Sequence, residues 1–406
     1  MKVYVARQPI FDVKNEVFGY ELLYRNNNKN AYDSSIEGSE ATKNLLSDVT
    51  TVFKLQSLTN QKYAFVNFTK ELLLQKLPKV LDEQEIVVEV LEDVIPDEEL
   101  IECIKDLKKR NMKIALDDYF EPGPIDVLIP YTDIIKVDFS FLNPDQRDAL
   151  AKSLKERAPH VRLLAEKVET EEEYERAKKA GYELFQGYYF SKPVMFSTSS
   201  VEIANSTGMR LFKEVNEECP SYQKMADIMK TDVGMTYAIL KKMNTLGSFR
   251  GNQITNIKDA LVRMGLFEVK KWVTLKIMRS VASDAAEESV RTSLVRGLFS
   301  EEIAKEVGWN HLKESAFMVG ILSGIDPEMN EEITKVLSEM GAYEDVKDAL
   351  LGSDNELRRI LVFVKMFEEG RWDEMKPILE VQINEEHVSD LYIRAVHNAD
   401  EIFDGV

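Results

Sequence analysis

Three apolar runs in the first half of the chain, IVVEV, KIAL and DIIKV, contain charged residues or end next to them. Runs of Val, Ile and Leu with little alternation are typical of parallel strands buried on both faces. Since α/β barrels place their sites at the carboxyl ends of such strands, the pattern predicts a polar site there. Converging carboxylates can hold hard divalent cations through oxygen. The charged residues are Glu89, Asp117, Asp118, Lys136 and Asp138.

The rest of the first half predicts an alternation of strands and helices. A turn is expected within FDVKNE, where Asp12 and Asn15 are turn-forming residues. Apolar positions at helical spacing, with Gly181 after the last of them, favour helices between the strands. Strands are expected at 2–6, 17–24, 63–68 and in the segments IVVEVLED, KIALDD, DIIKVDFSF, RLLAEKVET and YELFQGYYF, and helices at 40–57, 97–110, 144–157 and 170–181.

Two polar positions in these strands are ambiguous. Glu21 lies inside the second strand, and Arg25 follows it four residues later. On these residues alone, a charged pair at the end of a sheet is the preferred interpretation. The alternative is a metal-binding carboxylate beside an arginine that binds phosphate. Asn67 stands near the end of the strand at 63–68, where an asparagine more often fixes a turn than binds a metal.

The second half of the chain has a different pattern, which is helical throughout. Apolar residues recur at spacings of three and four in 208–217, 222–230, 234–246 and 257–265. No strand is expected after residue 200. The fold class predicted is therefore an α/β TIM-like barrel followed by an all-α domain. The expected boundaries are 1–196 for the barrel, 197–205 for a polar connection and 206–406 for the helical domain.

Composition and charge narrow the setting. The chain has 406 residues and a net charge of −19, which argues against binding to nucleic acid or to an anionic membrane. Its two cysteines form no CxxC pattern, as expected in a reducing cytoplasm. The N-terminus has no signal-peptide pattern, and no apolar run reaches 18 residues. A cytoplasmic protein without a membrane segment is expected.

The first 195 residues resemble a bacterial EAL domain, the fold of cyclic di-GMP phosphodiesterases. The family's motifs stand in the family's order, and eight weak motifs in one order are specific together. They are QPI (8–10), ELLYR (21–25), FVNF (65–68), VEVLE (88–92), LDD (116–118), KVD (136–138), AEKVE (165–169) and QGYYFSKP (186–193).

The resemblance implies a site for two divalent cations, Mg²⁺ or Mn²⁺, and roles for particular residues. The first metal would be held by Glu21, Asn67, Glu89 and Asp117, and the second by Asp118. Lys136 would orient the attacking water, and Glu166 and Gln186 would complete the site. Glu169 would brace the loop after the LDD motif, and Arg25 would meet a phosphate of the nucleotide. Paired metals stabilise both the attacking and the leaving oxygen at phosphorus.

The chain departs from the family pattern in three respects. The EAL triplet is Glu21-Leu22-Leu23 here, with leucine where alanine is usual. The glycine-containing loop that normally follows the aspartate pair is replaced by YFEPGP at 119–124, in which two prolines restrict the backbone. The segment between Asp118 and Lys136 is also shortened. Because this loop positions the second metal in the family, we expect at most weak binding of divalent cations.

The helical half resembles an HDOD domain, the non-catalytic relative of HD phosphohydrolases. The segment that carries the resemblance runs from Met225 to Leu266. Catalytic relatives bind metal through histidines and a His-Asp pair, whereas none of the four histidines here is followed by Asp. GILSGI at 320–325 replaces the relatives' GLLHDIG. No metal or other cofactor is expected in this domain, and its histidines are expected at the surface.

Two functions remain open. The altered loop and the context of the two-domain family favour a signalling regulator, in which a degenerate EAL domain senses nucleotide or binds a partner and the HDOD domain binds proteins as the output. The acids present at every motif position favour an active, metal-dependent phosphodiesterase that opens cyclic di-GMP to linear pGpG. We prefer the regulator at this point. The expected partners are cyclic di-GMP and proteins, and the resemblance leaves a homodimer open.

Overall fold

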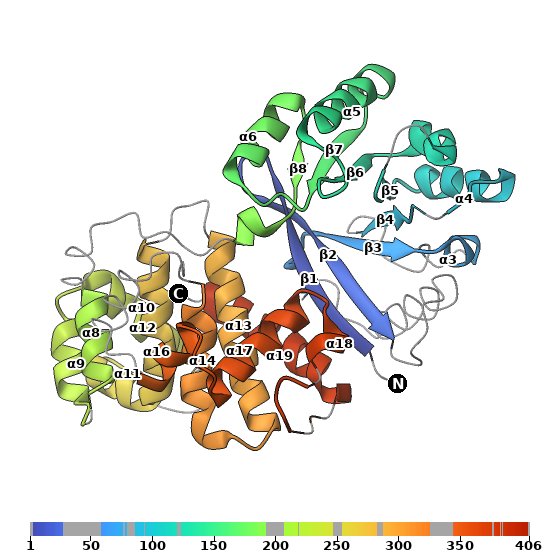
Figure 1. Ribbon diagram of the computed structural model, residues 1–406. Helices are drawn as coiled ribbons and strands as arrows, with labels where there is room; N and C mark the ends of the chain where they lie inside the picture. Colours follow the sequence, from blue (N-terminus) through green and yellow to red (C-terminus); the bar gives the residue numbers. More distant parts are fainter. Residues whose placement is uncertain are drawn as a thin grey trace. The chain divides into compact units, whose positions relative to one another are not determined.

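The computed structural model (Figure 1) describes most of the chain. The helix expected at 40–57 and the connection at 197–205 lie outside the described residues. Described are residues 3–26, 58–75, 78, 86–92, 94–119, 123–191, 207–217, 219–246, 254–281, 287–324, 344–375, 377–381, 383 and 385–404.

Eight strands in chain order form a closed barrel (Figure 1), which confirms the predicted fold of the first half. Strand β1 pairs antiparallel with β2 and with β8, while every other neighbouring pair is parallel. The strands are β1 Val3–Asp12, β2 Val17–Asn26, β3 Tyr63–Phe68, β4 Ile86–Val90, β5 Lys113–Leu116, β6 Ile134–Asp138, β7 Arg162–Glu166 and β8 Leu184–Phe185.

The turn between β1 and β2 is built as its residues predict. The Asp12 carboxylate accepts hydrogen bonds from the backbone N–H groups of Lys14 (2.8 Å) and Glu16 (3.0 Å). Asn15 takes a left-handed backbone with φ of 61°, which asparagine tolerates better than most residues. Both strands continue further than predicted, β1 to Asp12 and β2 to Asn26, because they pair with each other from Val3 to Phe11.

The helices around the barrel begin and end at residues with the expected capping chemistry. The side chain of Asp97 accepts from the Leu100 N–H, Asn143 forms a capping box with Gln146, and Gly181 ends its helix at φ of 101°. Thr69 occupies a cap position, but its side chain makes no cap hydrogen bond. The helices are α3 Lys70–Leu74, α4 Glu98–Lys109, α5 Pro144–Arg157 and α6 Glu171–Ala180, and a 3₁₀ helix, Pro124–Tyr131, stands between β5 and β6.

The last strand is shorter than predicted. Only Leu184–Phe185 of YELFQGYYF is strand, and Tyr188–Ser191 forms a 3₁₀ turn. At Gly187 the φ angle is 149°, and a Cβ there would lie 2.3 Å from the Val168 backbone nitrogen. The chain therefore leaves the sheet to pass close over the turn after β7, which only glycine permits.

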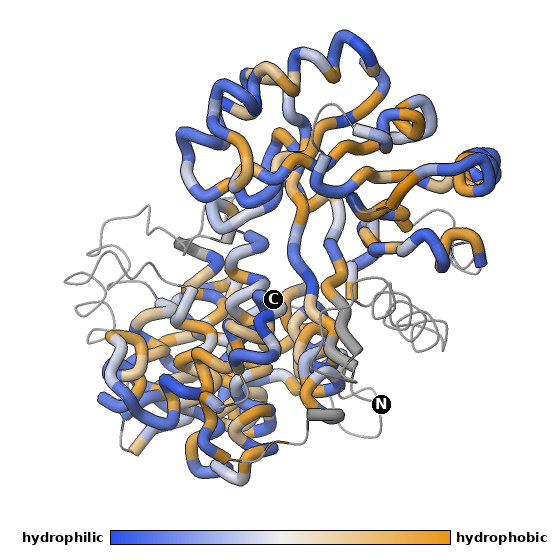
Figure 2. The backbone as a smooth tube through the Cα atoms, turned by 45° about the vertical axis from the view of Figure 1, so that its right-hand side comes forward, coloured by the Kyte–Doolittle hydropathy of each residue, from blue (hydrophilic) through white to orange (hydrophobic). Residues whose placement is uncertain are grey.

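One layer of apolar side chains fills the inside of the barrel. Figure 2 shows hydrophobic residues concentrated on the strands, with hydrophobic and hydrophilic positions alternating along the helices. The layer takes a residue from seven of the eight strands, as expected where strands alternate inward and outward side chains. Its members are Ile10, Phe65, Val87, Ala115, Ile134, Leu164 and Leu184.

After residue 200, the described residues form helices and turns but no strand, as predicted. Met225 and Met229 are fully buried core residues there. The α-helices are α8 Thr207–Val215, α9 Tyr222–Met229, α10 Val233–Leu246, α11 Ile257–Met264, α12 Leu266–Val281, α13 Glu287–Glu306, α14 Lys313–Leu322, α16 Glu344–Leu350, α17 Glu356–Glu368, α18 Trp372–Met375 and α19 Glu385–Asp404, with a 3₁₀ turn at Asn310–Leu312.

The chain divides into two compact units. The first contains Met1–Ser191 together with Met366–Asp373 and Asn384–Ile393, and the second contains Lys192–Lys365, Glu374–Ile383 and Arg394–Val406. The expected boundaries at 196 and 206 fall outside the described residues and stay predictions. Of the helices that the structure describes, none has both the length and the apolar character needed to span a bilayer.

Candidate functional site

A ring of polar side chains lies one level above the apolar layer of the barrel. Six of its members stand two residues further along the chain than a layer residue, so they point to the same inner side. Phe65 is followed in this way by Asn67, and Val87 by Glu89. Because β1 runs in the opposite direction, its member, Gln8, precedes Ile10. We call these residues the polar ring: Gln8, Glu21, Asn67, Glu89, Asp117, Lys136, Glu166 and Gln186.

Lys136 is the centre of the ring. Its ammonium lies 2.8 Å from a carboxylate oxygen of Glu89 and 2.8 Å from one of Asp117. Glu166 approaches it to 2.9 Å and Glu21 to 3.5 Å. The Lys136 side chain is only 1% exposed. A buried ammonium is costly without opposite charge close by, and the structure supplies four carboxylates.

Gln186 holds the Glu21 carboxylate of β2 in place. The Gln186 amide donates to Glu21 at 2.7 Å and to the Gln8 side chain at 3.0 Å. Gln8 and Glu21 are also directly opposite each other in the register of β1 and β2. Glu21 thereby points into the site. The interpretation preferred on its residues alone, a charged pair with Arg25 at the end of the sheet, involves a side chain that lies outside the description.

Four carboxylates share one ammonium, and the pKa values reflect this imbalance. Burial, with repulsion from Glu21 and Asp117, raises the pKa of Glu89 well above its ordinary value. Burial and the same two neighbours raise the pKa of Glu166 to about 8. Burial alone would lower the pKa of Lys136, but attraction to the carboxylates, Glu166 first, raises it well above its ordinary value. The site therefore has an excess of negative charge that a cation would relieve.

Asp118 joins the ring from the turn after β5. One oxygen from each of Asp117, Asp118 and Glu166 can be chosen so that all three lie within 4.8 Å of one another. Burial and the neighbouring Asp117 and Asp138 raise the pKa of Asp118 to about 6. Adjacent aspartates on a regular strand would point to opposite faces, but Asp118 has a left-handed backbone with φ of 39°. This turn lets both aspartates face one site.

The donor set fits hard divalent cations. Carboxylate oxygens gathered with an amide side chain and a surplus of negative charge match the ligands that Mg²⁺ prefers, and Mn²⁺ accepts the same ligands. Asn67 lies directly beside Glu89 in the register of β3 and β4. The Gln186 carbonyl oxygen is buried and has no hydrogen-bond partner among the described residues. These features are compatible with one or two cations at this end of the barrel.

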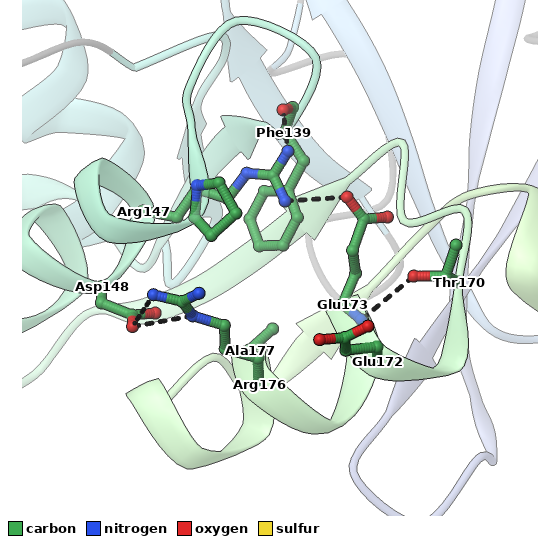
Figure 3. A pocket seen from close by; sticks show the side chains of 9 residues that line it. Phe139, Arg147, Asp148, Thr170, Glu172, Glu173, Arg176 and Ala177 are labelled. Atoms are coloured by element: carbon green, nitrogen blue, oxygen red, sulfur yellow. Dashed lines mark hydrogen bonds and ion pairs between the residues drawn. The ribbon is translucent and has the colours of Figure 1, made fainter.

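The turns after β6 and β7 are fixed to each other beside the ring. Asp138 accepts hydrogen bonds from the backbone and side chain of Ser140, both at 2.7 Å, and pairs with Lys167. Figure 3 shows Arg147 reaching from α5 to the Phe139 carbonyl and to Glu173 of α6. The same Glu173 carboxylate accepts the backbone N–H of Glu169 at 2.9 Å.

A cavity of about 200 Å³ lies between α5 and α6 (Figure 3). Its two arginines are already paired, Arg147 with Glu173 and Arg176 with Asp145 and Asp148. No residue of the polar ring lines it. The cavity is therefore a seam between two helices and not part of the carboxylate site.

The structure brings together most of the residues predicted for the site. Glu169 is exposed, and among the described residues no hydrogen bond or ion pair joins its side chain to the loop after Asp118, of which 120–122 lie outside the description. Arg25 lies in β2, but its side chain also falls outside the description. Gln8 and Lys167 were missed as site residues, although both stand in quoted motifs. The catalytic and binding roles of all these residues stay predictions.

The described residues of the helical half contain no comparable cluster. Among all the described residues, the group of acidic, His and Cys side chains placed to share an ion is the one in the barrel. All four histidines are exposed, as predicted. Ser323, in the segment that replaces the His-Asp pair, donates to the Gly320 carbonyl and accepts from Arg296 at 3.1 Å. A structural hydrogen bond thus stands where catalytic relatives need a metal ligand.

Fold and site define a class: an α/β barrel with an acidic site at the carboxyl ends of its strands, followed by a helical domain without metal ligands. The EAL domain family matches residues 41–193, and the HDOD domain family matches residues 203–349. An uncharacterized Bacillus subtilis protein, YuxH, is 32% identical over 412 residues that span 100% of both chains. The chain therefore belongs to the family of two-domain proteins in which an EAL domain precedes an HDOD domain.

The chain is also similar to a second relative and to a solved structure. The cyclic di-GMP phosphodiesterase CdgJ of Vibrio cholerae is 31% identical over 374 residues, which are 91% of this chain and 85% of that protein. A solved structure, the Bacillus subtilis YkuI protein with an EAL domain in complex with substrate c-di-GMP and calcium, is 17% identical. It covers 58% of this chain and 72% of that chain, with a TM-score of 0.36.

Proposed function

We propose that this protein is a metal-dependent phosphodiesterase that hydrolyses cyclic di-GMP to the linear dinucleotide. The observation that carries the proposal is the gathering of four carboxylates around the Lys136 ammonium, at 2.8 to 3.5 Å. The name of the relative CdgJ, which the chain matches over most of its length, supports the choice of substrate.

The residues of the polar ring would have two kinds of role, to bind cations and to orient the other reacting groups. Glu21, Asn67, Glu89 and Asp117 would hold one divalent cation, and Asp118 would help to hold a second. Bound cations would polarise the phosphodiester and stabilise charge on the attacking and leaving oxygens. Lys136, which stays protonated among these acids, would orient the attacking water and offset charge as it develops. Gln186 would keep Glu21 pointed at the centre.

The preference for a degenerate site rested on the loop at 119–124. Its replaced residues leave Asp118 beside Asp117 and Glu166, so the acids for a second cation remain together. For this reason we now favour the enzyme over a module that only senses nucleotide. The sensing module is the outcome to be expected if the nucleotide binds without being opened.

Turnover of cyclic di-GMP by the full chain, with Mg²⁺ or Mn²⁺ and with product separation, tests the proposal. Wild type should release linear pGpG, and Glu89→Gln should lose at least about 100-fold in rate, since it removes a buried charge at the centre. Glu175→Gln, an equal change on the exposed side of α6, should not alter the rate. Binding of nucleotide without turnover would support the sensing module, and absence of both would exclude each function.

The helical domain is proposed to act as a protein-binding output, because the segment aligned with its catalytic relatives lacks their metal ligands. Partner capture from a lysate by the full chain, with and without cyclic di-GMP, tests this. A nucleotide-dependent change in the captured proteins is expected, and capture of no partner under either condition would remove the proposal. Gel filtration with light scattering decides between a monomer and a homodimer.

A further inference from the structure

Tyr119 follows directly after the aspartate pair and is anchored at its far end. Its ring is buried, with 1% of the residue exposed. Its hydroxyl donates to a carboxylate oxygen of Asp126 at 2.6 Å and accepts from the Arg157 guanidinium at 3.1 Å. Arg157 also pairs with the other oxygen of Asp126 at 3.2 Å. Three side chains from the turn after β5, the 3₁₀ helix and the end of α5 thus close one hydrogen-bonded triangle.

The backbone between the ring and this triangle is under strain. Asp118 has φ of 39°, a conformation that costs a non-glycine residue of order 1 kcal/mol or more. The residues on either side are both fixed to strands. Asp117 N–H donates to the Val90 carbonyl at 3.0 Å, and Tyr119 N–H donates to the Lys136 carbonyl at 2.9 Å. Asp118 is therefore held as a short arch between β4 and β6.

We propose that Tyr119 is a positioning residue: its hydroxyl, locked by Asp126 and Arg157, holds the strained arch so that the Asp118 carboxylate faces Asp117 and Glu166. This inference rests on the proposed function, because it assigns the arch the task of presenting a ligand to the second cation. Tyr119 itself touches neither substrate nor ion. Its hydroxyl fixes where the chain leaves the arch, and the strained φ of Asp118 persists only while both ends are held.

The hydroxyl is the part of Tyr119 that this reading makes essential. The ring alone would fill its space and stabilise the fold by burial, as a phenylalanine does. Burial and the bond to Asp126 raise the Tyr119 pKa to about 12, so the group stays a neutral donor at physiological pH. If Tyr119 were purely structural, loss of its hydroxyl would lower only the stability of the fold. If it is a positioning residue, the same loss would also lower the affinity of the weaker of two cation sites.

Manganese binding by the full chain, without nucleotide, separates these two cases. The probe is Mn²⁺ alone, and free Mn²⁺ is counted by its electron paramagnetic resonance signal during titration. Wild type should bind two ions of unequal affinity. Tyr119→Phe should weaken the second ion by roughly 10-fold and leave the first unchanged, in keeping with losses at groups that orient metal ligands. Asp118→Asn should lose the second ion.

The matched control is Tyr174→Phe. Tyr174 is also buried, and its hydroxyl donates at 2.8 Å to the side chain of Asn15, which lies in the turn between β1 and β2. The Tyr174→Phe variant should lower the unfolding temperature about as much as Tyr119→Phe does, and it should leave both Mn²⁺ affinities unchanged. If Tyr119→Phe does not fold, Asp126→Asn, which removes the charge that locks the hydroxyl, should weaken the second ion several-fold.

The inference is overturned by identical isotherms for wild type and Tyr119→Phe, by equal losses in the Tyr174→Phe control, or by a wild type that binds fewer than two ions. Failure of the proposed function would appear in a different measurement, the turnover of cyclic di-GMP. A wild type that binds two Mn²⁺ but opens no cyclic di-GMP refutes hydrolysis, and the Mn²⁺ isotherms still decide the role of Tyr119.

Discussion

Buried charge is arranged in opposite ways in the two halves of this molecule. In the barrel, Lys136 faces four carboxylates. In the helical half, Lys271 of α12 pairs with Glu301 of α13 at 2.6 Å, and Lys305 closes on the same glutamate at 2.7 Å. The Lys271 ammonium also lies 4.2 Å from the centre of the Phe267 ring. Each group in this helical cluster has opposite charge close by.

This difference distinguishes a functional site from an ion-pair cluster that only stabilises the fold. Burying a charge is costly, and a balanced pair offsets that cost within the fold. The helical cluster does this and needs no ligand. The polar ring does not, because its carboxylates outnumber its ammonium and burial raises the pKa of Glu89 and Glu166. Groups kept in such an unfavourable state indicate a functional site.

Replacing the central lysine should have the largest effect. Lys136→Met keeps the length of the side chain and removes the only ammonium within 4.0 Å of Glu89 in the described structure. We expect turnover to fall roughly 1000-fold. Without added metal, the free energy of unfolding should fall by about 3–5 kcal/mol, since the buried carboxylates lose their partner. Product formation and urea unfolding followed by circular dichroism measure the two effects.

The surplus of negative charge also predicts how this variant responds to cations. Mg²⁺ should stabilise Lys136→Met more than it stabilises wild type, because the variant has more uncompensated charge to relieve. Lys152→Met, on the exposed side of α5, serves as the control and should behave as wild type. Wild-type turnover in Lys136→Met would contradict the role given to the ring.

Loss of one ring carboxylate should weaken metal binding without unfolding the barrel. Asp117→Asn removes a charge that lies 2.8 Å from Lys136 and keeps the shape of the side chain. The affinity for Mg²⁺ or Mn²⁺ should fall at least roughly 10-fold, a loss comparable to that at groups that support metal ligands. Calorimetric titration measures the change. An unchanged affinity would place the cation away from Asp117, and Asp133→Asn, on the outer side of the barrel, is the control.

Much of the barrel site was visible in the sequence because its geometry follows from the two-residue period of strands. Phe65 and Asn67, or Val87 and Glu89, are two residues apart, so an inward apolar residue predicts an inward polar one. The motif order then supplied Glu21, which its own neighbours had not distinguished from a surface pair. The boundaries of helices with capping residues, such as α5 with Asn143, were also predictable.

Other features depend on contacts that sequence distance conceals. The shortening of β8 follows from the close approach of Gly187 to Val168, nineteen positions earlier in the numbering. The triangle of Tyr119, Asp126 and Arg157 joins residues up to 38 positions apart. No local sequence pattern predicts such a contact, because each of these residue types is common in an exposed turn or at the end of a helix.

In the helical half, removing one member of the balanced cluster should cost less. Lys271→Met leaves Glu301 with its second partner, Lys305. We expect a loss of about 2 kcal/mol in unfolding free energy, the scale of a hydrogen bond to a charged group. Turnover of cyclic di-GMP should not change. Urea unfolding measures the stability. A loss as large as that of Lys136→Met would remove the distinction between the helical ion-pair cluster and the polar ring.

The smallest effect is expected when both members of the helical pair are replaced. In Lys271→Met with Glu301→Gln, Lys305 still pairs with Glu302 at 2.7 Å, so no buried charge is left alone. The double variant should unfold within about 1 kcal/mol of wild type, as when a buried ion pair is replaced as a unit. The matching change in the barrel, Lys136→Met with Glu89→Gln, cannot recover stability in this way, because Glu21, Asp117 and Glu166 still face one another without an ammonium. Urea unfolding of the four single variants and two double variants should therefore show recovery of stability in the helical half but not in the barrel. Equal recovery in both would mean that the ring is balanced by groups other than Lys136, and that its surplus of charge is not what prepares it for a cation.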